Sequence, residues 1–129
     1  MQIRENKIMV AKYMGGFIAK SITSSICIEI NPPIKNQLWY NIDSELKYDS
    51  SWEWLMPVVE KIEKESIFSV QSIYDKREEF KGWIPELFTL RVKDDIKGIG
   101  LDELRFSTKI EATYKAVIEF IKWYNEKNL

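Results

Sequence analysis

The sequence predicts a single α+β domain over residues 1–129, with a short N-terminal helix, an antiparallel sheet of about four strands and two long helices packed on one face of that sheet. Three observations favour this fold class. The length lies within the usual range of one domain, two segments with helical periodicity begin at capping signals, and each strand-like segment has one polar face, as in an antiparallel sheet. The predicted order of elements is α-β-β-α-β-β-α.

The first predicted element is a short amphipathic helix over residues 5–14. Gly15 and Gly16 follow it directly. Because glycine accepts the left-handed backbone found at helix ends, the two glycines predict where this helix stops. Its apolar residues are Ile8, Met9, Ala11, Tyr13 and Met14.

Two strands are predicted next. Isoleucine recurs at every second position over residues 26–30, and this period is typical of a half-buried strand. The segment 17–30 is therefore either a hairpin that turns near residues 23–25 or one long bent strand. The Asn-Pro-Pro sequence at residues 31–33 is expected to end it, since proline has no amide to offer the ladder. Residues 38–42 alternate again and predict the following strand.

A capping box predicts the first long helix. Ser50 and Glu53 are spaced so that the hydroxyl and the carboxylate can satisfy free amides at a helix start. The helix is expected to begin at about Ser51 and to bend locally at Pro57, which removes one hydrogen bond. Its apolar side chains form one broad arc, with Trp54 near the edge, where the ring would be half exposed. The arc consists of Trp52, Trp54, Leu55, Met56, Val58, Val59 and Ile62.

Two further strands are predicted over residues 68–74 and 88–92, where apolar and polar residues alternate. The segment between them, Asp75 to Glu86, is a charged connection that carries Phe80, Trp83 and Pro85. It is long for a hairpin loop.

The last predicted element is a helix with a second capping box, formed by Thr108 and Glu111. Its apolar residues recur at spacings of three and four, so this helix is expected to pack along most of its length. Opposite charges recur at i,i+4 on the remaining strip, which consists of Glu111, Lys115, Glu119, Lys122 and Glu126.

Two stretches resemble segments of small phage and prophage proteins. Residues 48–62 and 107–125 are similar to the paired helices of the phage ABA sandwich domain, whose members combine a Tyr-Ser-x-x-x-x-Trp helix with an Ala-rich helix near the C-terminus. The resemblance implies a phage or mobile-element origin and brings no activity or catalytic residues. The chain departs from a three-layer sandwich because Thr89, Arg91 and Lys93 make one face of the sheet polar.

Composition argues against most enzyme classes. The chain has no histidine and one cysteine, Cys27, so the side chains that most often transfer protons or bind zinc near neutral pH are nearly absent. Glu29, the charged residue closest to Cys27, would raise the pKa of the thiol and disfavour a catalytic role. We therefore predict a non-enzymatic protein without a cofactor.

Charge and hydropathy limit the classes of partner. Nineteen basic and twenty acidic side chains leave a net charge of −1, so no global field attracts nucleic acid or an anionic membrane. No apolar run approaches the roughly 20 residues of a membrane span, and the N-terminus lacks the pattern of a signal peptide. We expect a cytoplasmic protein with no membrane partner, and the lone cysteine agrees with a reducing compartment.

Protein binding is the function that the sequence favours, with an unidentified protein or a second copy of the chain as the partner. Four residues are candidates for the binding surface. Trp39 is expected to point away from the apolar side of its strand, and Phe80, Trp83 and Arg77 lie in the charged connection. Trp and Arg are residue types enriched at interface hot spots.

Two alternatives remain open. A nucleic-acid-binding module would use the 75–86 loop, where cationic and aromatic side chains interleave, although glutamates in the same loop cancel most of the field. A metal-dependent enzyme would use Asp94 and Asp95, whose carboxylates are hard oxygen ligands suited to Mg²⁺ or Ca²⁺. The same adjacent aspartates also favour a turn.

Overall fold

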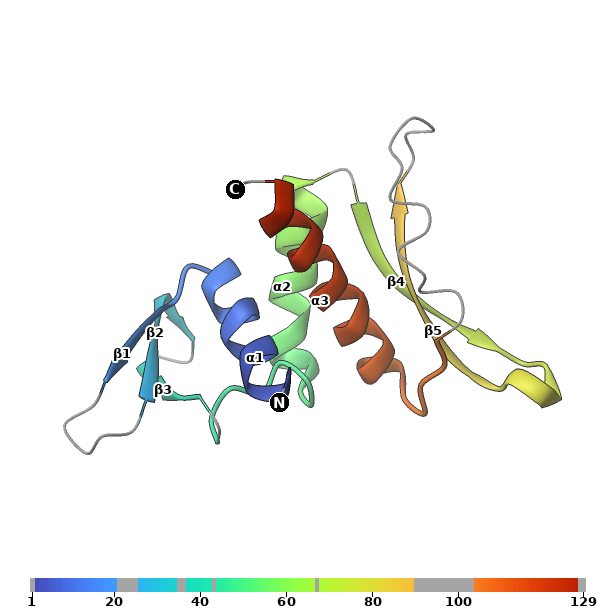
Figure 1. Cartoon of the computed structure of the whole chain (residues 1–129), viewed down its shortest axis with the longest axis horizontal. Coiled ribbons are helices and arrows are strands. Elements are labelled where there is room, and N and C mark those ends of the chain that lie inside the picture. The colour runs from blue at the N-terminus through green and yellow to red at the C-terminus, as the bar shows by residue number, and fades with distance from the viewer. Residues whose placement is uncertain are drawn as a thin grey trace. The chain divides into compact units, whose positions relative to one another are not determined.

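The computed structural model describes residues 2–20, 26–34, 37–42, 44–66, 68–89 and 104–127. These residues form an α+β fold with three α-helices, five strands and one short 3-10 helix. The chain divides into two compact units, Met1–Tyr48 and Asp49–Leu129 (Figure 1). Within the described residues, no helix is both long enough and apolar enough to cross a membrane.

The first unit begins with helix α1, Gln2–Tyr13, which starts three residues before the predicted helix of residues 5–14 and ends one residue earlier. Gly15 has a φ of 94° in the left-handed region, and its amide donates to the Lys12 carbonyl while the Gly16 amide donates to the Ala11 carbonyl. The predicted glycine stop is confirmed, because a residue with a Cβ rarely adopts this backbone. Val10 and Ala11 are buried on the helix.

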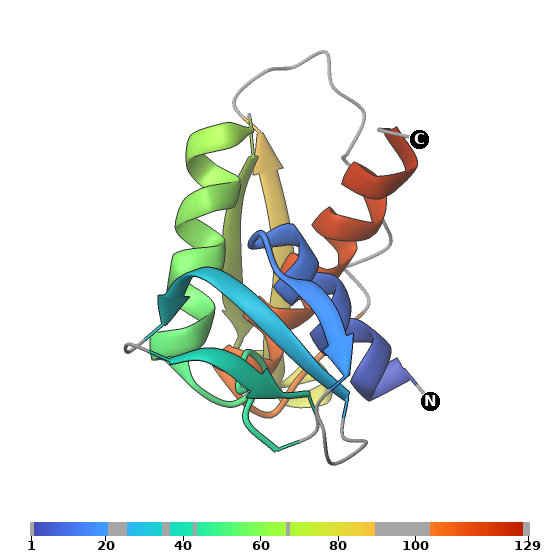
Figure 2. The same cartoon turned by 90° about the vertical axis from the view of Figure 1, so that its left-hand side faces the viewer.

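An antiparallel sheet follows, with the order β1-β2-β3. Strands β1 (Phe17–Lys20) and β2 (Ile26–Ile34) pair antiparallel. The segment 17–30 is therefore a hairpin and not one long bent strand. Strand β3 (Gln37–Asn41) pairs with the other edge of β2. Figure 2 shows α1 behind this sheet, in agreement with its contacts to β2.

The expectation that the two prolines end the second strand is wrong. Pro32 and Pro33 lie inside β2, which runs on to Ile34. The pairing of β2 with β3 shifts its register between Glu29 and Ile34, so the prolines occupy an irregular stretch of the strand. A proline that lacks an amide is tolerated where the regular ladder is interrupted.

In the second unit, helix α2 spans Trp52–Glu65 and continues through Pro57. The predicted capping box is not confirmed: Ser51, one residue after Ser50, is the N-cap, and its side chain forms no cap hydrogen bond. Trp54 is also more buried than expected, with 7% of its surface exposed, whereas 39% of Trp52 is exposed. Periodicity gives the arc of a helix but not which edge of that arc is covered.

A β-hairpin follows α2. Strand β4 (Phe68–Asp75) agrees with the predicted strand, and it pairs antiparallel along its whole length with β5 (Gly82–Thr89). The predicted long loop over residues 75–86 is therefore wrong: the hairpin turn is short and contains the 3-10 helix η1 (Glu78–Phe80). Gly82 and Pro85 are unfavourable in a strand by local preference, and the pairing of β5 with β4 overrides this preference. Residues 90–92 of the predicted strand lie outside the described residues.

Helix α3, Lys109–Lys127, begins at the predicted cap. The Glu111 amide donates to Thr108 Oγ1 at 3.3 Å, and the Thr108 hydroxyl donates to Glu111 Oε1 at 2.7 Å. On the polar strip, Lys115 and Glu119 form an i,i+4 ion pair at 2.7 Å, and Lys122 approaches Glu119 at 3.7 Å. This N-terminus therefore has an N-cap hydrogen bond of the kind that Ser51 does not form in α2.

The core of the second unit lies between the hairpin and the helices. Helix α3 contacts both strands, while α2 contacts β4 and α3. The Phe68 ring packs edge-on against Phe120 and Trp123, with centroids 6.0 and 5.4 Å away. The prediction of one sheet of about four strands is wrong, since the described strands form a three-stranded and a two-stranded sheet. Alternation predicts a strand but not its neighbour.

Candidate functional site

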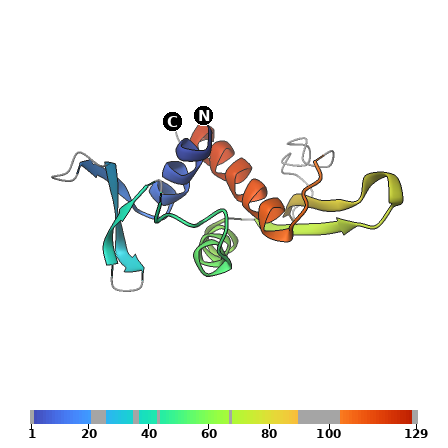
Figure 3. The same ribbon diagram turned by 90° about the horizontal axis from the view of Figure 1, so that it is seen from below.

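The end of the β4–β5 hairpin carries a cluster of aromatic and cationic side chains. Figures 1 and 3 show the hairpin extending past the start of α3. We call this cluster the tip surface; it consists of Tyr74, Arg77, Phe80, Trp83, Arg105 and Lys109. These residues come from both strands, the turn, the segment before α3 and the first turn of α3.

A single carboxylate organises the cations of the tip surface. Asp75 accepts hydrogen bonds from the Arg77 guanidinium at 2.8 to 3.2 Å, from the Arg77 amide at 3.1 Å and from Arg105 Nη2 at 3.0 Å. Only 8% of the Asp75 side chain is exposed, although the hairpin end is open. The donated hydrogen bonds of Arg77, with a smaller contribution from Arg105, hold the pKa of Asp75 well below its usual range.

The same interactions fix the geometry of the turn. The Asp75 carboxylate raises the pKa of the Arg77 guanidinium by hydrogen bonding and charge. Arg105 also donates from Nε to the Phe80 carbonyl at 3.1 Å, so one side chain joins the segment before α3 to both sides of the turn. A turn held by two guanidinium groups loses little conformational freedom when a partner binds.

Cations lie against the aromatic rings. The Arg77 guanidinium is 4.9 Å from the centroid of Phe80, and Lys109 Nζ is 5.7 Å from the centroid of Trp83. Tyr74 packs edge-on against Trp83 at 5.2 Å. Half of the Phe80 surface and 40% of the Tyr74 surface are exposed, so the rings remain accessible to another molecule.

Three of the four predicted candidates come together here. Arg77, Phe80 and Trp83 all belong to the tip surface. Trp39 belongs to the Met1–Tyr48 unit, where it lies in β3 opposite Glu29, and its side chain lies outside the described part of the chain. The exposure of Trp39 therefore stays a prediction.

Sequence reasoning missed the other half of the tip surface. The strand prediction for Tyr74 is correct but does not show that its ring joins this cluster, and Arg105 and Lys109 lie more than twenty residues along the chain from the turn. No local pattern predicts that Arg105 and Asp75 meet, because their contact depends on how the segment before α3 returns to the hairpin. The one local signal for this surface is the high density of aromatic and cationic residues over 74–83.

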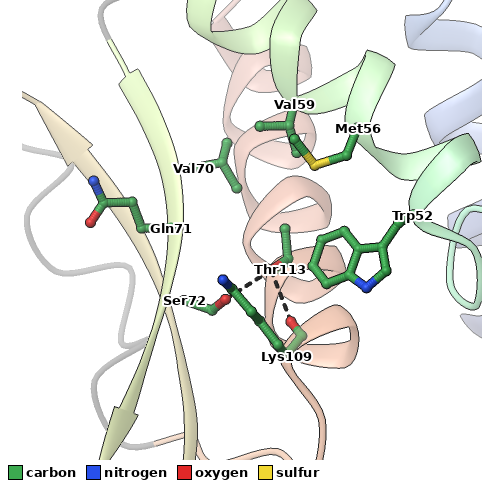
Figure 4. A pocket seen from close by; sticks show the side chains of 8 residues that line it. All are labelled: Trp52, Met56, Val59, Val70, Gln71, Ser72, Lys109 and Thr113. Atoms are coloured by element: carbon green, nitrogen blue, oxygen red, sulfur yellow. Dashed lines mark hydrogen bonds between the residues drawn. The ribbon is translucent and has the colours of Figure 1, made fainter.

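A groove lies beside the tip surface, between α2, β4 and α3 (Figure 4). Its volume is about 620 Å³, within the range of peptide- and ligand-binding clefts. Ser72 Oγ lies 2.9 Å from Thr113 Oγ1, which donates to the Lys109 carbonyl, and this network forms the floor. The lining residues are Trp52, Met56 and Val59 from α2, Val70, Gln71 and Ser72 from β4, and Lys109 and Thr113 from α3.

The structure does not place the predicted metal ligands. Asp94 and Asp95 lie outside the described residues. Among the residues that are described, no three Asp, Glu, Cys or His side chains are arranged to hold a metal ion. The described residues at the tip offer one buried carboxylate that is already bound by two arginines, which is a poor cation site.

Comparisons of the chain with protein-family models, with curated proteins and with solved structures find no match.

Proposed function

We propose that the chain is a non-enzymatic protein-binding module that holds a protein partner with the tip surface. The observation that carries this proposal is the half-exposed Phe80 ring beside an Arg77 side chain that Asp75 already holds in place. Exposed aromatic and arginine side chains are the types that dominate binding energy at interfaces. A phage or prophage origin stays a prediction that depends on the resemblance alone.

Folding alone gives little reason for the exposure of Phe80, because a large ring left half in water forgoes part of its burial. The hydrogen bonds of Asp75 with Arg77 and Arg105 stabilise the turn, and they also order the Arg77 side chain beside this ring before a partner arrives.

Nucleic acid binding is the weaker candidate. The segment 75–86 has three cationic and four anionic side chains. Two of the cations are paired, Arg77 with Asp75 at 2.8 Å and Lys81 with Glu78 at 3.3 Å. Little positive potential is left to attract a phosphate backbone.

Site-specific photo-crosslinking tests the proposal. A photoreactive phenylalanine analogue at position 80 is expected to crosslink a discrete protein in cells, and the crosslink should weaken when Arg77→Ala is added. The same analogue at Ile3, which is 69% exposed in the other unit, is the matched control. Crosslinks to nucleic acid would favour the alternative, and equal crosslinking at positions 80 and 3 would argue against a dedicated surface.

A further inference from the structure

We propose that the groove between α2 and β4 binds an extended peptide segment of a protein partner, which adds as a strand to the outer edge of β4 and places an acidic group beside Lys109. The groove shares only Lys109 with the tip surface. The proposal therefore does not depend on the function proposed for that surface.

The hydrogen-bond pattern shows which way the backbone of β4 faces. Trp83 exchanges both backbone hydrogen bonds with Phe106, so Trp83 and its opposite residue Tyr74 direct their backbone groups away from each other. This direction alternates from one residue to the next along an antiparallel strand, so it is the same at every second residue. The backbone amide and carbonyl groups of Ser72 and Val70 therefore also point away from β5. Pro85 lies opposite Ser72 and agrees with this pattern, because a proline has no amide and fits a position where no hydrogen bond to the neighbouring strand is made.

The outer edge is protected at its beginning and open further along. The Phe68 amide donates to Ser66 Oγ at 3.1 Å, and the Val70 amide donates to Glu63 Oε2 at 3.2 Å. In the described part of the chain, no group accepts from the outward amide of Ser72, and no strand pairs with this edge. An exposed strand edge is a template for another strand.

The groove lies where the edge is open. Consecutive side chains of a strand point to opposite faces, so a groove lined by three consecutive residues, 70–72, runs along the edge of β4 and reaches its backbone. The opposite wall presents Trp52 and Met56, one helical turn apart on α2 and 39% and 41% exposed. An added strand would gain hydrogen bonds from β4 and would bury alternate apolar side chains against this wall.

Charge gives the peptide its polarity. Lys109 lines the groove at the end near Ser72, whereas the Glu63 carboxylate lies at the other end, on the Val70 amide. A peptide with an acidic group near Lys109 and none near Glu63 is complementary to both ends. The acidic group is either a C-terminal carboxylate or an Asp or Glu side chain.

Selection from a library of random ten-residue peptides on the intact chain tests the binding class. We expect enriched sequences with apolar residues at alternate positions and an acidic group at one end. Met56→Lys should weaken a selected peptide by at least about tenfold, whereas Phe80→Ala, which alters only the tip surface, should leave its affinity unchanged. Failure to enrich any peptide, or equal binding to M56K, would overturn the proposal.

A charge exchange tests the role of Lys109. Lys109→Glu should weaken the selected peptide by about tenfold, and replacing the peptide's acidic residue with lysine should restore binding to this variant. Two pairs of peptides distinguish the sources of the negative charge. Weaker binding after amidation of the C-terminus would assign it to the terminal carboxylate, and weaker binding after replacement of an acidic residue by its amide would assign it to that side chain. Loss of binding that no peptide charge restores would overturn the assignment.

Amide exchange tests the added strand. Binding of the selected peptide should slow exchange of the Ser72 amide and should leave the Lys81 amide, at the hairpin turn, unchanged. An unprotected Ser72 amide in the complex would contradict strand addition. Protection of Ser72 without peptide, together with a dimer in size-exclusion chromatography, would assign the edge to a second copy and overturn the proposal.

Discussion

Trp83 and Phe106 exchange both of their backbone hydrogen bonds, at 2.9 Å from the Trp83 amide to the Phe106 carbonyl and at 3.0 Å in the reverse direction. This bridge joins β5 to the segment before α3 and brings Arg105 to the hairpin turn. Gly82, next to the bridge, has a φ of 150°, and a Cβ at this position would lie 2.9 Å from the Cβ of Arg105.

Gly82→Ala is therefore expected to lower the free energy of unfolding by about 1–3 kcal/mol, because alanine is strained at this φ and collides with Arg105. Lys81→Ala, at the exposed neighbouring position, is the matched control and should change it by less than about 0.5 kcal/mol. Urea unfolding monitored by circular dichroism measures both. Equal stability of the two variants would show that the chain relaxes around Gly82.

Asp75→Asn is expected to destabilise the chain in a pH-dependent way. Since folding lowers the pKa of Asp75 below its ordinary value of 3.8, the ionised carboxylate stabilises the fold above that pH. This stabilisation is lost as the pH falls from 3.8 toward the lowered pKa of the folded state. The gap in unfolding free energy between wild type and variant should be constant near neutral pH and should narrow in acid. If the difference in unfolding free energy widened in acid instead, the result would contradict a lowered pKa of Asp75 in the folded state.

The two helix starts should respond differently to loss of their hydroxyls. Thr108→Ala removes the acceptor of the Glu111 amide and should cost about 1 kcal/mol. Ser51→Ala should cost less than about 0.5 kcal/mol, because the Ser51 hydroxyl forms no cap hydrogen bond. Chemical denaturation of the two variants measures the difference, and similar losses would indicate that the N-cap of α2 also forms a side-chain bond in solution.

Phe68→Ala should be strongly destabilising, at about 3–5 kcal/mol. Phe68 is 1% exposed and packs against two rings of α3. Ile73→Ala on the opposite face of β4, where the side chain is 45% exposed, should cost less than about 1 kcal/mol. Thermal unfolding separates the two, and a large loss from Ile73→Ala would mean that this face is covered in solution.

Local patterns predicted most of the individual elements. The glycine stop after α1, the strand β4 and the capped start of α3 depend on neighbours within four residues, and the structure agrees with each prediction. The prediction failed for β5, whose first half contains Gly82 and Pro85, two residues that are uncommon inside strands. Strand β5 is set by its pairing with β4, which no local pattern contains.

The candidate site divides in the same way. The aromatic and cationic residues of the turn were visible as a dense segment, and Arg77, Phe80 and Trp83 do lie together. The contribution of Arg105 depends on a contact thirty residues apart in the chain. The groove depends on the exposed edge of β4 and on the side of α2 that faces it.

By itself, the sequence determined the α+β class, the glycine stop of α1, the capped start of α3 and the presence of surplus aromatic side chains, because hydrophobic period and backbone preference act within a few residues. Only the tertiary structure decided how the strands are shared between two sheets, which tryptophan of α2 stays exposed, and which carboxylate holds the arginines of the tip surface. These outcomes depend on pairing and burial between segments far apart in the chain, where a local pattern carries no information about the partner.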